Sequence, residues 1–411
     1  MRVCTALGQL IGKLDMRILH ILSYTTPEAG GSVLLGLDQT RRLAERGHDV
    51  AIYTTNRRYP RGIEQVPLDR PVQRAGVRVL YFPVEFPPML VSRRLANALS
   101  RNIHSFDIVH CHGIYRFPQI AAGYFARRAG VPYIVRPHGS LDPFVYNQKE
   151  RKIFKRMFER LFMYDYLNGA AALHFTDREE HERVKFLGLT SPPVIIPNGI
   201  DTGIYARDDL KGCFRAEYGL ENHPIILHLG RLSKQKGLDL LVPAFARLRC
   251  EQPDAVLVLA GPDNDGFKAS VERWITAAGI GDAVRFTGML RGDAKLAALI
   301  DADVFVAPSY FENFGTTVVE AMAAGTPVIV SDQVYIWRDI VEPGGGGVTP
   351  CDAEALATAL IDLLADDERR ARMAERAVDI ARNRFDWDTV IPRLEETYRG
   401  LARKTHQGRA L

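Results

Sequence analysis

The segment from Pro308 to Val330, PSYFENFGTTVVEAMAAGTPVIV, limits the possible folds of this chain more than any other stretch. It follows an apolar run at 304–307 that predicts a buried parallel strand, and it ends in a second apolar run at 328–330. Between the two runs the pattern is helical from about Thr316 to Ala324, and the tripeptide Gly-Thr-Pro at 325–327 ends this helix. The order of strand, polar loop, helix and strand predicts one unit of a parallel α/β sheet.

Two glutamates and a glycine in this segment indicate the kind of ligand that it binds. Gly315 precedes the helix and allows a ligand to approach the free N–H groups at the helix start, which suit a phosphate. Glu312 lies in the loop, and Glu320 lies about one turn into the helix. Carboxylates do not help to bind an anion. We therefore expect a ligand that carries both phosphate and hydroxyl groups, as a nucleotide sugar does.

The same residues carry a resemblance to a known family. Glu312 and Glu320, with FG between them and AMAAGTPV after them, resemble the Glu-x7-Glu motif of the retaining family 4 glycosyltransferases of GT-B fold. The resemblance implies that the first glutamate contacts the donor sugar and that the second contacts the ribose hydroxyls. The alternative, two solvated acids at a helix start, does not explain the whole segment. The other donor contacts implied here are Asn313, Phe314, Gly315, Thr316 and Thr317.

A second segment, PIILHLGRLSKQKGLDLLVPAF at 224–245, supplies positive charge. After its predicted strand come Gly230, Arg231 and Lys236. Arginine offers a forked pair of donors and lysine a compact charge, a combination that suits a diphosphate. The P-loop pattern GxxxxGK[ST] is absent. In the resembling family the equivalents of Arg231 and Lys236 bind the donor diphosphate; the alternative is two cations on a surface loop.

Two further units of strand followed by loop, at 256–265 and 284–290, are typical of the edge of a nucleotide-base pocket. We expect Gly261, Gly288 and Met289 to line that pocket.

The first half of the chain shows the same alternation of strands and helices. RILHILSY, directly after Met16, predicts a first strand, and the next loop contains Gly30 and Gly31 before a helix. In the resembling family this loop faces the reacting end of the donor and the acceptor, although a glycine pair alone is more often a simple turn. Further strands are expected at 50–55, 77–82, 108–111, 133–136 and 172–175, which together predict a doubly wound sheet.

His138, in VRPHGSLD, follows a predicted strand end, where ligands bind in open parallel sheets. A lone histidine is usually structural. In the resembling family, however, a strand-end histidine of this kind contacts the donor sugar or the region of the leaving phosphate. His110 and His112 also flank a strand end, but they lack a matching motif, and we interpret them as structural.

The fold class is therefore α/β. A length of 411 residues allows two domains. The resemblance, which runs from about Met16 to Leu401, implies the GT-B arrangement of two Rossmann-like domains that face a central cleft. The expected parts are an N-terminal acceptor domain at 16–198, a C-terminal donor domain at 199–385, a final helix at about 386–401 that packs back on the first domain, and tails at 1–15 and 402–411. Met16 is a candidate for the true start.

Charge is unevenly distributed along the chain. Residues 1–200 carry 28 Lys and Arg against 17 Asp and Glu, whereas residues 201–411 carry 25 against 32. A basic half suits an anionic partner such as a lipid surface or a lipid diphosphate, or it is only a solvated surface with an uneven balance. The stretch 149–168 combines apolar Phe154, Met157, Phe158, Leu161 and Phe162 at helical spacing with lysines and arginines. We expect its apolar side chains to face the core, and its charges to face anionic lipid.

No run approaches the ~18 apolar residues of a membrane-spanning helix, and five scattered cysteines suggest reduced thiols. We expect a cytoplasmic protein, peripheral on the inner membrane, that acts in bacterial polysaccharide or glycolipid assembly.

The resemblance implies a retaining transferase that moves a sugar from a UDP- or GDP-linked donor to a glycan or lipid-linked hydroxyl. It implies neither a metal ion nor another cofactor, and we expect no nucleic acid partner. The expected catalytic residues are Glu312, His138, Arg231 and Lys236. An epimerase of GT-B fold and a non-catalytic nucleotide-sugar-binding protein remain as alternatives.

Overall fold

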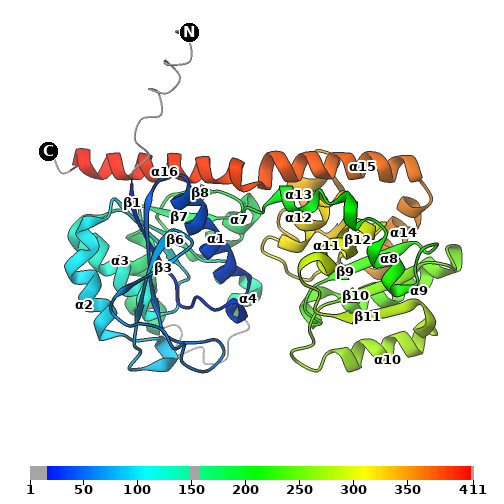
Figure 1. The fold of residues 1–411 in the computed structure, drawn as a ribbon, viewed down its shortest axis with the longest axis horizontal. Coiled ribbons are helices and arrows are strands. Elements are labelled where there is room, and N and C mark those ends of the chain that lie inside the picture. The colour runs from blue at the N-terminus through cyan, green and yellow to red at the C-terminus, as the bar shows by residue number, and fades with distance from the viewer. Residues whose placement is uncertain (1–15, 148–156, 409–411) are drawn as a thin grey trace, which may run out of the picture. The chain divides into compact units, whose positions relative to one another are not determined.

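The computed structural model describes residues 16–147 and 157–408, and its chain divides into two units (Figure 1). The first unit contains the residues up to Ile196 and those from Val390 onward, and the second contains Pro197–Thr389. These divisions lie a few residues from the expected boundaries at 198 and 386. The final helix, α16 (Trp387–Gly408), contributes most of its length to the first unit.

The sheet of the first unit has eight strands in the order β3-β4-β2-β1-β5-β6-β7-β8. All neighbours are parallel except β3, which runs antiparallel to β4 at the edge. The strands are β1 (Arg17–Ile21), β2 (Asp49–Thr55), β3 (Pro71–Arg74), β4 (Val77–Phe82), β5 (Ile108–His112), β6 (Tyr133–Arg136), β7 (Ala172–Phe175) and β8 (Pro193–Ile195).

Helices cover both faces of this sheet, as expected for a doubly wound fold. One face carries Leu19, Val109 and Val135 in an apolar core with α2, α3 and α6. The opposite face lies against α1 and α16, which place Gln39 and Tyr398 beside His110. The helices are α1 (Gly31–Glu45), α2 (Arg93–Asn102), α3 (Phe117–Ala129), α4 (Pro143–Asn147), α6 (Tyr164–Asn168) and α7 (Arg178–Val184).

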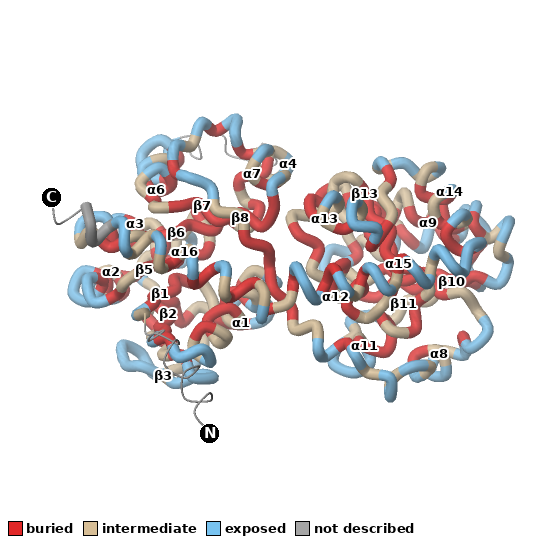
Figure 2. The backbone as a smooth tube through the Cα atoms, turned by 90° about the horizontal axis from the view of Figure 1, so that it is seen from above, coloured by how far each residue is buried: buried red, intermediate tan, exposed pale blue. Residues whose placement is uncertain are grey.

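The sheet of the second unit has six parallel strands in the order β11-β10-β9-β12-β13-β14. Its inner strands β10, β9, β12 and β13 are buried (Figure 2), and their side chains alternate between two apolar cores, because successive side chains of a strand point to opposite faces. The strands are β9 (Ile225–Leu229), β10 (Val256–Ala260), β11 (Val284–Gly288), β12 (Val304–Ala307), β13 (Val328–Ser331) and β14 (Gly346–Thr349).

One core of the second unit packs against α9, α10 and α14, and the other packs against α8, α11, α12 and α15. The helices are α8 (Cys213–Tyr218), α9 (Leu238–Glu251), α10 (Lys268–Ala278), α11 (Gly292–Asp301), α12 (Thr316–Ala323), α13 (Trp337–Val341), α14 (Ala353–Leu364) and α15 (Asp367–Ile380). The expected α/β fold with two parallel sheets is therefore confirmed.

The expectation that the apolar side chains of 149–168 face the core is wrong for three of the four that the structure describes, whereas Phe158 is half-buried and packs against the core. Met157, Leu161 and Phe162 are exposed by 54%, 59% and 50%; Phe154 lies outside the described residues. The inward positions are instead Met163 and Glu159, and the carboxylate of Glu159 accepts hydrogen bonds from two tyrosine hydroxyls. Because a satisfied glutamate takes an inward position, Met157, Leu161 and Phe162 lie on the outer face.

Among the helices of the described residues, none is long and apolar enough to cross a membrane. The four described cysteines, Cys111, Cys213, Cys250 and Cys351, are free thiols.

Candidate active site

The carboxyl edge of the second sheet brings together residues from segments that are far apart in the sequence. Strands β9, β10 and β11 are neighbours; β9 and β10 lead into Gly230 and Gly261, and β11 ends at Gly288. Strand β12, on the other side of β9, leads into Pro308. Ligands of open parallel sheets bind at this edge. The predicted donor-binding residues of the second unit are therefore clustered there.

At this edge the loops pack backbone against backbone. A Cβ atom on Gly261, whose φ is +152°, would lie 1.8 Å from the carbonyl oxygen of Gly230, and one on Gly237 would lie 2.0 Å from that of Pro308. Neither position can hold a larger residue without moving the backbone. The N–H of Gly261 donates to the carbonyl oxygen of Gly288 at 2.7 Å, and the N–H of Gly230 donates to that of Ala260 at 2.9 Å, which joins the three strand ends.

Lys236 and Glu312 form an ion pair at the centre of this cluster, and their side chains are 16% and 22% exposed. The backbone of Glu312 is fixed by hydrogen bonds with Gln333 and Tyr335, both of 3.0 Å. Arg231 is exposed and has no ion-pair partner among residues 16–147 and 157–408. The site thus holds one neutralised pair and one guanidinium that is available to an anion.

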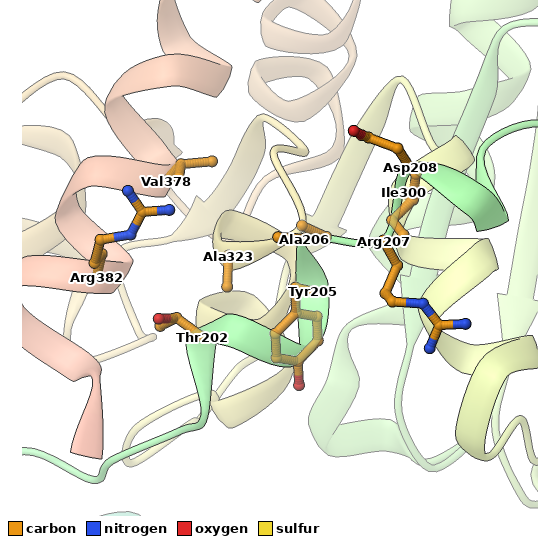
Figure 3. Close-up of a pocket in the computed structure, with 10 residues that line it drawn as sticks. Thr202, Tyr205, Ala206, Arg207, Asp208, Ile300, Ala323, Val378 and Arg382 are labelled. Carbon is orange, nitrogen blue, oxygen red and sulfur yellow. The ribbon is translucent and has the colours of Figure 1, made fainter. Parts of the chain in front are cut away.

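Glu320 belongs to a second ion pair that sequence reasoning missed. Its carboxylate lies 2.6 Å from the amino group of Lys295 on α11, and its side chain is 12% exposed. Burial and the nearby Glu320 carboxylate raise the pKa of the Tyr205 hydroxyl. Tyr205 also lines a pocket of about 180 Å³ together with Arg207 and Arg382 (Figure 3). None of the predicted donor residues lines this pocket.

The start of α12 follows Gly315, which is its N-cap residue. In the described part of the chain, the N–H groups of Thr316 and Thr317 donate to no other residue, so they remain available to a ligand. The ring of Phe314 is buried and packs against Phe385 with their centroids 5.6 Å apart. Only the backbone of Phe314 can therefore contact a ligand. Asn313 is half-buried, and Met289 is 54% exposed.

His228 is a further residue of this site that the sequence analysis missed. Its Nδ1 lies 3.0 Å from the carbonyl oxygen of Val306, to which it donates, and burial lowers its pKa to about 4. Its Nε2 lies beneath Gly230, 3.4 Å from the position of a Cβ atom on that glycine. A polar residue inside an otherwise apolar strand was the available signal.

In the first unit the predicted residues also lie at the carboxyl edge of the sheet. Gly30 and Gly31 follow β1 and start α1. No atom lies within 4 Å of a Cβ placed on either glycine, so the space beside them is open. His138 follows β6, and its Nε2 lies 3.1 Å from Nδ1 of His112.

Comparison with known proteins identifies related chains over both units. Residues 30–199 match the glycosyl transferase 4-like domain, and residues 213–379 match the glycosyl transferases group 1 family. D-inositol 3-phosphate glycosyltransferase of Stackebrandtia nassauensis is 30% identical over 93% of this chain and 91% of that protein. A GDP-mannose-dependent phosphatidylinositol monomannoside mannosyltransferase of Mycolicibacterium smegmatis is 28% identical over 86% of this chain and 91% of its own length.

Among solved structures, Anabaena HepE in complex with UDP superposes with a TM-score of 0.76 at 21% identity, over 94% of this chain and all of that one. This similarity shows the fold, and the sequence matches show the family. The chain therefore belongs to the group 1 glycosyl transferases, with the α/β architecture of the GT-B fold.

Proposed function

We propose that this glycosyltransferase moves a sugar from a nucleotide diphosphate sugar to an acceptor hydroxyl with retention of anomeric configuration. The observation that carries the proposal is the paired arrangement of Lys236 and Glu312 beside the unpaired Arg231. The cations suit a diphosphate, and the glutamate suits sugar hydroxyls. A GDP- or UDP-linked donor is supported by two similar proteins. The name of one relative specifies GDP-mannose, and one structural neighbour is a complex with UDP.

In the proposed reaction, negative charge develops on the departing diphosphate. Arg231, Lys236 and the N–H groups of Thr316 and Thr317 would stabilise this charge, because they are positioned before the reaction begins. These groups supply the positive charge that a metal ion supplies in other transferases, and we propose that no metal or other cofactor is required. Activity that persists in EDTA would support this proposal, and activity lost in EDTA and restored by Mg²⁺ would contradict it.

Glu312 is not proposed as a nucleophile, although retaining glycosidases use a carboxylate in that role. Its charge is neutralised by Lys236, and its proposed partners are sugar hydroxyls. We propose instead that the acceptor attacks the face from which the diphosphate leaves, and that a phosphate oxygen takes the acceptor proton. Glu320, held by Lys295, would bind the ribose hydroxyls, and Gly261, Gly288 and Met289 would line the base pocket.

A donor screen tests the proposed function. UDP-, GDP-, ADP- and dTDP-sugars are added singly, and the thermal shift and the slow release of nucleotide are measured. We expect one base to give both stabilisation and release, since ligand binding to the folded state alone raises its stability. An isomerised donor formed without acceptor would indicate an epimerase. Binding without release in the presence of acceptors would indicate a non-catalytic protein, and no response at all would contradict the assignment of a nucleotide-sugar site.

We also propose that the first unit binds an anionic membrane surface, where a lipid-linked acceptor would lie. Exposed apolar side chains gather around α4, 157–163 and the turn after α7: Met157, Leu161, Phe162 and Phe186. Two aromatic pairs hold this region together, because Phe158 packs on Phe162 at 5.6 Å and Tyr146 packs on Phe186 at 5.7 Å, and the hydroxyl of Tyr146 donates to Glu159 at 2.7 Å. We call Met157, Leu161, Phe162 and Phe186 the apolar patch. Exposed Arg160 and Lys185 flank it and suit anionic lipid.

Substitution within the apolar patch tests this membrane contact. Replacing both Leu161 and Phe162 with serine is expected to weaken binding to vesicles of anionic lipid by more than tenfold. Each apolar side chain that leaves water for the lipid contributes about 1.5–3 kcal/mol to the free energy of binding. Flotation at low and high salt measures the binding. Ile204→Ser, at a site of 47% exposure in the second unit, is the matched control and should bind like the unmodified protein. Equal flotation of all variants, or none at low salt, would contradict the proposal.

A further inference from the structure

One face of the first sheet carries ionisable side chains where a buried sheet normally carries apolar ones. His20, His110, His112, Arg136 and His174 lie on four neighbouring strands and are buried, with exposures of 0–6%. They occupy alternate positions that point away from the apolar core containing α2 and α3. Every such group needs a hydrogen-bond partner, because burying a polar atom without one is costly.

Part of this face forms a chain whose hydrogen positions are fixed by a carbonyl group. Nε2 of His174 lies 2.9 Å from the carbonyl oxygen of Ile196, which can only accept, so His174 carries its hydrogen on Nε2. Its Nδ1 then accepts from Nε2 of His110, at 3.4 Å. Nδ1 of His110 accepts from Gln39 and Tyr398, at 3.2 and 2.6 Å. This chain ends on α1 and α16 and serves packing.

A separate chain leads from the same face to the predicted site. Nδ1 of His20 lies 3.0 Å from Nε2 of His112, and Nδ1 of His112 lies 3.1 Å from Nε2 of His138. His138 is half-buried and follows the sheet edge. The next residue along the chain is held by Glu180, whose carboxylate accepts from the N–H of Gly139 at 3.0 Å. Within the described residues, Nδ1 of His138 has no hydrogen-bond partner and is available to a ligand.

A metal ion does not suit this cluster. Ring nitrogens of His20, His110 and His112 lie within 4.8 Å of one another, which is close enough to consider one. However, the guanidinium of Arg136 is buried near all three, and its positive charge repels a cation. The rings of His110 and His112 also stack, with centroids 4.5 Å apart, rather than converging on a common centre. The geometry of these three histidines therefore suits hydrogen bonds between the rings better than a shared metal ion.

The row of hydrogen bonds from His20 through His112 to His138 can run in either of two directions. If each ring donates toward His20, the buried Nε2 of His20 carries an N–H that has no partner among the described residues. If each ring donates toward His138, Nε2 of His20 carries only a lone pair, which faces the positive field of Arg136. The second arrangement costs less, because orphaned N–H groups are the rarer defect and a positive charge favours a lone pair.

We propose that His20 and His112 are positioning residues that hold His138 in the tautomer with hydrogen on Nδ1, so that His138 donates a hydrogen bond to a ligand oxygen at the carboxyl edge of the first sheet. The role of the donated hydrogen bond rests on the proposed function, whereas the tautomer itself does not. Burial and Arg136 also keep the pKa of His138 well below its usual value, so the donor is neutral.

Nuclear magnetic resonance of ring-¹⁵N-labelled histidine reads the tautomers directly, without substrate. In the unmodified protein, His138, His112 and His20 are expected to carry hydrogen on Nδ1, the less common form in water. A His138 resonance of the Nε2–H form would overturn the proposal. In His112→Met, which removes the donor to His138, the His138 signal should move toward the Nε2–H form. In His112→Gln, whose amide can still donate, it should remain in the Nδ1–H form.

Kinetics separate positioning from packing. With the donor found by the screen, His112→Gln is expected to keep turnover within a few-fold of the unmodified protein, and His112→Met to lose at least tenfold at equal thermal stability. Equal loss in both variants would mean that His112 only fills space, and it would overturn the positioning role. If no nucleotide sugar is turned over, the proposed function fails, and the tautomer measurement still decides whether the histidine chain is ordered as described.

Discussion

Replacing Arg231 with alanine is expected to lower turnover by about 10²–10³-fold, the usual effect of removing one preorganised group that stabilises transition-state charge. Arg231 is exposed and has no ion-pair partner in the described ranges 16–147 and 157–408, so its loss should leave the fold intact. Substitutions at such surface positions usually change the free energy of unfolding by less than about 0.5 kcal/mol. Nucleotide release at saturating donor, measured beside the thermal midpoint, checks both expectations.

A matched control for this variant is Arg376→Ala. Arg376 is also exposed, belongs to the same unit and lies on α15, away from the sheet edge that holds the predicted site. It should keep full activity. Loss of activity in both variants would point to a general effect of charge. Full activity in Arg231→Ala would remove this residue from the proposed diphosphate site.

Acidification is expected to destabilise the first unit steeply. Burial and the charge of Arg136 lower the pKa of His20 to about 3 and hold those of His110, His112 and His174 well below 6.5. In the unfolded chain these histidines bind protons as the pH falls through about 6.5, whereas in the folded chain they do not. Stability is therefore full above pH 6.5 and decreases below it. Between pH 7 and 5.5 the loss is about 1 kcal/mol for each histidine, about 4 kcal/mol in all.

Calorimetric unfolding at several pH values between 7.5 and 5 measures this loss as a falling midpoint for the first unit. His104→Gln, which changes an exposed histidine of the same unit, is the control and should leave the pH dependence unchanged. His174→Asn should make it shallower. A midpoint that does not change down to pH 5 would show that the four histidines are not buried as neutral groups.

The fold was largely predictable because its strands are short apolar runs separated by helices. The strands at 133–136, 172–175 and 304–307 have the boundaries expected from the sequence. Parallel strands buried on both faces leave a strong signal of this kind. The antiparallel edge strand β3, PVQR, gave no such signal, because it begins with proline and is mostly exposed.

The site was predictable only as far as each segment carries its own pattern. Motifs placed Arg231, Lys236 and Glu312 at strand ends, and the structure places them at one sheet edge. The partner of Glu320 was not predictable. Lys295 is an ordinary residue of an amphipathic helix, and only the packing of α11 beside α12 brings the two together.

The histidines of the first unit show the same limit. Their alternation on a strand was visible for His110 and His112, but the contact with His20 comes from the neighbouring strand, and that with His138 comes from a loop. Hydrogen bonds between segments that are far apart in sequence depend on strand order, which a single sequence does not specify. The exposed Leu161 was mispredicted for a related reason, since two tyrosines from other segments allow Glu159 to face inward.

The ion pair between Lys236 and Glu312 bears on product release and on inhibition. Because the two side chains neutralise each other before a ligand arrives, a ligand that takes one of them must also provide a partner for the other. In the proposed complex a sugar diphosphate does so, with phosphate oxygens for the lysine and hydroxyls for the glutamate. The nucleoside diphosphate left after transfer offers only the phosphates, and Glu312 then competes with it for Lys236, which favours dissociation. An inhibitor that combines a diphosphate with a hydroxyl-bearing ring would therefore bind more tightly than the spent nucleotide.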